Sequence, residues 1–272
     1  MKRIITLLIL STLCTSAFTR EKGPSKFCLS SKEFITTVIY LRSKKDFGLD
    51  EKSILKISDT VSRGCTNASD RFVKIMKVLT KIGIDTKSSL ETAMEFSHKT
   101  DEHTQAFIEI FKYSYNPDKM DLDILASMKV ALKLSLNFDG DVKIALKNYK
   151  KLVSFCLDHK NLGLSSSQCA KLSQEIVSMG EGHQKLLASK FIRLVRFLQK
   201  SKKGPKLPLL KAISKAKVII GMGESAEKNF IQAFKFASSK KGLAYSDLKA
   251  MDLAEKLASR STKTDKLVKV QK

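Results

Sequence analysis

The chain has 272 residues, and its 50 basic side chains outnumber its 27 acidic ones, giving a formal net charge of +23. Tryptophan is absent, proline is rare and 43% of the residues are hydrophobic, so the composition excludes a disordered chain and is typical of a folded protein. The charge excess is concentrated in residues 186–272, which carry 21 Lys and Arg against 6 Asp and Glu. Such a concentration indicates an anionic partner more than it indicates general solubility.

Residues 1–17 have the three zones of a secretory signal peptide. Met1–Arg3 is positively charged, the stretch up to Leu13 is mostly apolar, and small residues precede a cleavage point near residues 17–19. Lipid attachment at Cys14 is the alternative, which the bulky Leu13 before it disfavours. We therefore expect an exported protein, secreted or periplasmic, or passing through the endoplasmic reticulum to the outside if the source is eukaryotic.

Apolar residues recur every three or four positions through the rest of the chain, as in Phe72, Ile75, Met76 and Leu79. This is the spacing of amphipathic helices, and no stretch alternates with the period of two that a half-buried strand requires. The pattern predicts an all-α protein. We expect a helical domain over 18–259, a basic C-terminal tail over 260–272, and helices at 30–45, 50–64, 69–81, 86–98, 101–115, 118–136, 141–159, 165–179, 183–200, 207–220, 224–240 and 246–259.

A degenerate motif recurs at the predicted turns. Residues 47–58 align without gaps on residues 162–173, and both segments share Gly, Leu, Lys and Ser at matching positions. In this motif a glycine ends one helix in a left-handed conformation, an apolar residue packs back, and Asp or Ser caps the next helix. The frame also fits Gly83, begins another copy at Gly242 and a poorer one at Gly204, and leaves room for one degenerate copy near residues 117–122.

The spacing of these glycines sets the size of the repeat. Gly48 and Gly83 lie 35 residues apart, and the intervals from Gly163 to Gly204 and on to Gly242 are 41 and 38 residues. Such a period holds two helices and two turns, so we predict stacked helical hairpins that form an irregular α-solenoid. An irregular helical bundle is the alternative. Tetratricopeptide and ankyrin signatures are absent from the sequence.

Cleavage of the leader leaves an even number of cysteines, namely Cys28, Cys65, Cys156 and Cys169. In an oxidising compartment an even number favours disulfides over buried thiols, and three connectivities are open. The pairs 28–65 and 156–169 are each centred on a copy of the turn motif, so we expect these two bonds. Asn67 begins an Asn-Ala-Ser glycosylation acceptor, which is meaningful only if the source is eukaryotic.

No constellation predicts catalysis, a metal or a cofactor. His98 and Glu102 share a helix face, but His103 points elsewhere and no third ligand is evident, so a solvated polar segment is the better interpretation. The stretch from Gly221 to Ala226 resembles a dinucleotide-binding turn, but no parallel strands surround it. We therefore interpret Gly221 as the end of a helix.

The densest basic run has no acidic residue from 200 to 217. It predicts binding to phosphate-bearing polymers or to an anionic membrane surface, and a solvated linker is the alternative. Specific nucleic-acid binding is disfavoured because the excess is lysine, 42 against 8 arginines, and the run holds no aromatic residue for base stacking. The run comprises Lys200, Lys202, Lys203, Lys206, Lys211, Lys215 and Lys217.

These features predict a non-enzymatic helical-repeat protein that engages an acidic partner through its basic C-terminal third. The partner can be an acidic protein, an anionic polymer or a lipid surface. The alternative is a secreted helical enzyme whose polar side chains assemble from distant helices.

Overall fold

The computed structural model describes residues 30–136, 138, 140–179 and 185–270, and of residues 261–270 it describes the backbone alone. Within these residues the chain forms α-helices and one short 3-10 helix, and no strand, as the periodicity predicts. The elements are α1 Ser31–Arg42, η1 Lys45–Phe47, α2 Glu51–Ser62, α3 Ala68–Lys81, α4 Thr86–Ser97, α5 Asp101–Tyr115, α6 Ile124–Ser135, α7 Val142–Leu157, α8 Ser166–Met179, α9 Leu187–Lys200, α10 Leu209–Gly221, α11 Ala226–Ser238 and α12 Asp247–Val270.

Two helices differ from their predicted bounds by six residues or more, and the others by at most four. The helix expected to begin at residue 118 begins at Ile124, because Asp123 caps it by accepting a hydrogen bond from the Ala126 N–H at 2.8 Å. The residues before this cap form the turn between α5 and α6. At the other end, α12 continues to Val270, through the segment predicted as a basic tail.

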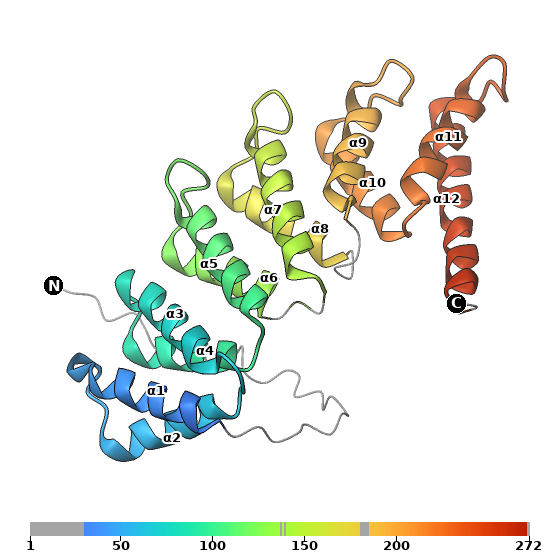
Figure 1. The fold of residues 1–272 in the computed structure, drawn as a ribbon. Coiled ribbons are helices and arrows are strands. Elements are labelled where there is room, and N and C mark those ends of the chain that lie inside the picture. Colours follow the sequence, from blue (N-terminus) through green and yellow to red (C-terminus); the bar gives the residue numbers. More distant parts are fainter. Residues whose placement is uncertain (1–29, 137, 139, 180–184, 271–272) are drawn as a thin grey trace.

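Successive helices pair into antiparallel hairpins, α1 with α2 through to α11 with α12. The hairpins follow one another as an arc, in chain order (Figure 1). Each first helix of a hairpin packs on the first helix of the next one, and most second helices stack on one another in the same way. This arrangement confirms stacked hairpins and not an irregular bundle. The turns inside the last four hairpins all lie along the outer edge of the arc (Figure 1).

Each hairpin turn contains one residue with a left-handed backbone. Gly48, Gly83 and Gly163 occupy this conformation in three turns, with φ of 64°, 84° and 58°, so the predicted role of these glycines is confirmed. The degenerate copy expected near residues 117–122 is also present, with Asp121 at φ 51°. The next residue then packs back: the N–H of Leu122 donates to Ser114 O at 3.0 Å, and that of Leu164 to Cys156 O at 3.1 Å.

The frame predicted for Gly204 and Gly242 is wrong by two residues. The left-handed residues of those turns are Lys206 and Ala244, each with φ of 51°. The glycines serve a different purpose, because a Cβ at Gly204 would collide with the carbonyl oxygen of Phe197, and one at Gly242 with that of Phe236. Glycine is therefore required there for close backbone approach and not for its freedom in φ.

A line of aromatic side chains forms the centre of the core. Each first helix from α3 onward buries at least one aromatic side chain completely. The Tyr149 hydroxyl, the one polar group in this line, is satisfied by Ser114 Oγ at 3.1 Å, and burial raises the pKa of Tyr149 to about 12. The line comprises Phe72, Phe107, Tyr149, Phe191 and Phe230.

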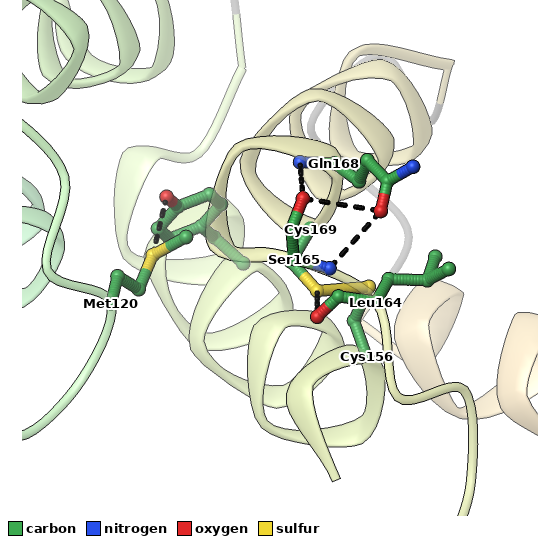
Figure 2. The surroundings of a disulfide bond; sticks show 7 residues. Met120, Cys156, Leu164, Ser165, Gln168 and Cys169 are labelled. Atoms are coloured by element: carbon green, nitrogen blue, oxygen red, sulfur yellow. Dashed lines mark hydrogen bonds between the residues drawn. A yellow bond between two sulfur atoms is a disulfide. The ribbon is translucent and has the colours of Figure 1, made fainter. Parts of the chain in front are cut away.

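A disulfide joins α7 to α8 across their turn (Figure 2). It links Cys156 and Cys169, whose Cα atoms lie 5.5 Å apart, so this predicted pair is confirmed. Beside it, Ser165 and Gln168 form a capping box: the Ser165 N–H donates to Gln168 Oε1 at 3.0 Å, and the Gln168 N–H donates to Ser165 Oγ at 3.4 Å.

The other predicted pair stays a prediction, because Cys28 lies outside the described residues. Its expected partner, Cys65, is half-buried at the turn before α3, where its Sγ donates to Arg63 O at 3.7 Å.

Glycosylation of Asn67 also stays a prediction. In the folded chain the exposed Asn67 amide donates to Asp101 Oδ2 at 3.3 Å, and the Ser69 hydroxyl of the acceptor triplet is buried against Glu33.

Candidate basic surface

The seven lysines of the predicted basic run begin at the end of α9 and continue through the turn into α10. Lys202, Lys203 and Lys206 lie in the turn and are exposed, as is Lys211 in the first turn of α10. Lys200, the last residue of α9, donates from Nζ to the carbonyl of Lys160, which lies in the turn between α7 and α8. The structure therefore brings the first part of the run together at the outer edge.

The last two lysines of the run point away from this edge, into ion pairs between hairpins. Lys217 Nζ lies 2.5 Å from Glu175 Oε2 in α8, and Lys215 Nζ lies 2.7 Å from Glu255 Oε1 in α12. Each pair is about one-third exposed. Because both ammonium groups are directed at carboxylates of the flanking second helices, they tie α10 to its two neighbours and do not extend the surface of the turn.

The turn from 201 to 208 is closed by backbone hydrogen bonds that hold its lysines outward. Ser201 O accepts from the Gly204 N–H at 3.1 Å, and Leu198 O accepts from the Leu207 N–H at 2.7 Å. The Ser201 hydroxyl also accepts from the Lys203 N–H at 3.2 Å. A compact loop of this kind presents its ammonium groups from a defined backbone.

The next hairpin repeats the same turn, which sequence reasoning missed. Lys240 and Lys241 precede the left-handed Ala244 by four and three residues, as Lys202 and Lys203 precede Lys206. Both turns read Ser-Lys-Lys-Gly, at 201–204 and 239–242, and neither contains an acidic residue over 201–208 or 239–246. The identical tetrapeptide in the sequence could have identified the second basic turn.

The two turns lie in successive hairpins at the same edge of the arc (Figure 1). We call their five exposed lysines, Lys202, Lys203, Lys206, Lys240 and Lys241, the basic turn surface. Two partly exposed apolar side chains, Leu243 at 41% and Tyr245 at 43%, accompany it. The turn between α1 and α2 carries a related Ser-Lys-Lys segment at 43–45, but Asp46 follows there and offsets part of its charge.

A second basic feature is a surface groove of about 610 Å³ between the C-terminal parts of α3 and α5. Lys77, Lys81 and Lys112 line it around an apolar floor that includes Phe111 and Tyr115. Among the described residues, no carboxylate lies within ion-pair distance of these three ammonium groups. None of the lysines that line the groove belongs to the predicted basic run, which begins at Lys200.

The described residues contain no group of three His, Cys, Asp or Glu side chains that could hold a metal ion. Burial lowers the pKa of both His98 and His103, and the nearby cations Arg71 and Lys99 lower them further.

The glycine-rich stretch from Gly221 to Ala226 is the predicted helix boundary, because α10 ends at Gly221 and α11 begins at Ala226. No helix of the described part is long and apolar enough to cross a membrane.

Comparison with known proteins gives no relative: the chain matches no family model, no curated protein and no solved structure. Its class therefore follows from its own architecture, which is an α-solenoid of stacked helical hairpins.

Proposed function

We propose that this chain is an exported, non-enzymatic binding protein that engages an acidic partner through the basic turn surface. One observation carries the proposal. Two successive hairpin turns with the same Ser-Lys-Lys-Gly sequence present five exposed lysines at one edge and no acidic residue. The turn itself requires the glycine of this tetrapeptide, but hairpin packing does not require two adjacent lysines to be repeated at equivalent positions.

The chemistry of this surface favours a partner with spread negative charge. Lysine ammonium groups are point charges on flexible stems and do not form the bidentate contacts that arginine makes. They attract an acidic protein segment, an anionic polymer or an anionic lipid surface largely by their summed field. Export is supported by the predicted leader and by the disulfide between Cys156 and Cys169, since such bonds persist in oxidising compartments.

The proposal is tested by charge reversal. A chain carrying Lys202→Glu, Lys203→Glu and Lys206→Glu should lose most of its binding to a heparin-like polymer, to anionic vesicles or to an acidic peptide, whichever the native chain binds. Reversal of Lys240 and Lys241 should have a similar effect, although they lie far away in sequence. Binding should also weaken steeply as salt is raised, because exposed charges are screened.

The matched control reverses three exposed lysines that lie outside the surface, Lys129, Lys133 and Lys147. It changes the net charge by the same amount as the first variant and should leave most of the binding intact. Equal loss from both variants would show that net charge alone drives the interaction, and the proposed site would then be abandoned. Circular dichroism of each variant confirms that the fold is retained.

A further inference from the structure

The first helices of the hairpins share a register that is counted from the left-handed residue of each turn. Tyr113 and Phe155 lie eight residues before Asp121 and Gly163, and each directly precedes the residue whose carbonyl accepts the N–H that follows the left-handed residue. Phe197 lies nine residues before Lys206, because that turn is one residue longer, but it precedes Leu198, which accepts in the same way. Each of these rings is covered by a cation of the following hairpin, and the set of pairs is Lys150 over Tyr113 at 6.0 Å, Arg196 over Phe155 at 5.3 Å and Lys235 over Phe197 at 5.8 Å.

The last hairpin carries the same aromatic residue without a cover. Phe236 lies eight residues before Ala244, on α11, and 59% of its surface is exposed. Phe155 and Phe197, which have a following hairpin, are only 6% and 7% exposed. Phe236 therefore marks a surface that the solenoid elsewhere uses for stacking.

A polar position in the same register is also unsatisfied on α11. Glu33 and Asn148, each fifteen residues before its left-handed glycine, accept a hydrogen bond from the next first helix, from the N–H of Ser69 at 2.7 Å and of Ala188 at 3.2 Å. Both donors are the second residue of their helix. Asn229 lies fifteen residues before Ala244, and its amide makes no hydrogen bond with any described residue.

The opposite end of the arc presents the complementary surface. Ile35 and Ile39 of α1 lie thirteen and nine residues before Gly48, as Ile231 and Lys235 lie before Ala244. In α11, Lys235 faces the preceding hairpin, where it covers Phe197, and Ile231 is partly buried against the core. In α1 no described residue covers the matching positions, and Ile35 and Ile39 are 55% and 64% exposed.

We propose that these two ends bind each other, so that α1 of a second copy docks on α11 and continues the solenoid. In this contact Ile39 covers Phe236, and the Asn229 amide oxygen accepts the N–H of Lys32, the second residue of α1. The interface is head to tail, because two different surfaces meet, and such a contact extends into chains of molecules. The continuity argues for a second copy: each end has the register of an interface already made between hairpins.

The experiment measures the mass of the full chain by sedimentation velocity over a range of concentrations. We expect mass to rise with concentration, and high salt to strengthen the association, because it screens the repulsion between copies of a strongly basic chain. Phe236→Asp and Ile39→Asp should each remove this rise. A mixture of the two variants should form a dimer that grows no further, since only one intact head and one intact tail can meet. Asn229→Ala should weaken the association.

Leu125→Asp is the control, because Leu125 is 70% exposed on α6 and lies on neither end. It should leave the association unchanged. A native chain that stays monomeric at every concentration overturns the proposal, as does association that survives both end variants. If Ile39 is instead covered within one molecule, Ile39→Asp lowers the melting temperature of a chain that is monomeric throughout, and this result also overturns the proposal.

Discussion

At the scale of single residues, the buried carboxylate of Glu33 connects the first two hairpins. Its Oε2 accepts from the Ser69 N–H at 2.7 Å and from the Ser69 hydroxyl at 2.5 Å, and the side chain is 4% exposed. Burial by itself raises the pKa of Glu33, but the hydrogen bonds from Ser69 and Asn67 and the charge of Lys32 together outweigh it, so the pKa is lowered from its ordinary value of 4.5.

Replacement of Glu33 should therefore be costly and should change the pH dependence of stability. Because a charged acceptor is lost and a buried N–H is orphaned, Glu33→Ala should lower the free energy of unfolding by about 1.5–3 kcal/mol. A lowered pKa means that the native chain gains stability from this carboxylate above pH 4.5 and loses it as the pH falls through the folded value. Urea unfolding at a series of pH values should show a larger acid-side loss of stability in the native chain than in Glu33→Gln, and the difference measures the contribution of Glu33.

The disulfide is the other residue-scale feature with a measurable consequence. Cys156 and Cys169 are 13 residues apart, and closure of a loop of this length restricts the unfolded chain by about 3 kcal/mol. The double variant Cys156→Ser, Cys169→Ser should unfold at lower urea than the oxidised native chain. Added reductant should lower the urea midpoint of the native chain toward that of the variant and should leave the midpoint of the variant unchanged. Equal midpoints for the oxidised chain and the variant would contradict the prediction.

At the scale of elements, the hairpin turns depend on one left-handed residue each. Ala244 adopts φ 51°, which costs a residue with a Cβ about 1–2 kcal/mol, whereas glycine adopts it freely. Ala244→Gly should therefore raise the free energy of unfolding by about 0.5–1 kcal/mol, after allowance for the greater freedom of glycine in the unfolded chain.

Replacing glycine by alanine at an equivalent turn should change the free energy of unfolding in the opposite direction. Gly163 adopts φ 58°, and a Cβ there would lie 3.3 Å from His159 Nδ1. Gly163→Ala should lower the free energy of unfolding by about 1 kcal/mol or slightly more. Chemical denaturation of both variants beside the native chain measures the two effects. A loss of stability in Ala244→Gly would show that the turn is held in another conformation in solution.

At the scale of the whole molecule, each hairpin packs chiefly on its immediate neighbours. Stability in such an array is distributed as terms for single repeats and for nearest-neighbour interfaces. Damage to a terminal hairpin should therefore remain local, whereas damage in the middle should affect hairpins on both sides.

Two buried phenylalanines test this expectation. Phe107→Ala in α5 removes a ring whose centroid lies 4.9 Å from that of Phe96. It should lower the free energy of unfolding by about 3–5 kcal/mol and speed hydrogen exchange in the hairpins on either side. Phe230→Ala in α11 should accelerate exchange mainly in α11 and α12. Uniform acceleration along the chain in both variants would instead identify a single cooperative unit.

Helices, most turns and one disulfide could be predicted from the sequence because they depend on residues close together in the chain. The spacing of Phe72, Ile75 and Met76 predicts a helix face by itself, and Cys156 and Cys169 flank a single turn. The left-handed conformation of Lys206 and Ala244 could not be predicted, because neither residue is a glycine. Their positions are set by the hydrogen bond that the following residue donates back to the helix, from Leu207 to Leu198 O and from Tyr245 to Ala237 O.

Only the tertiary structure decided which lysines share a surface and which apolar residues stay uncovered. Lys215 and Lys217 belong to the same basic run as Lys202, yet stacking places them beside Glu255 and Glu175, which lie 40 and 42 residues away. Stacking likewise buries Phe197 and leaves Phe236 exposed, although the two residues hold matching places in their helices. Periodicity determines which side of a helix is apolar, but burial depends on whether another hairpin is present to cover that side.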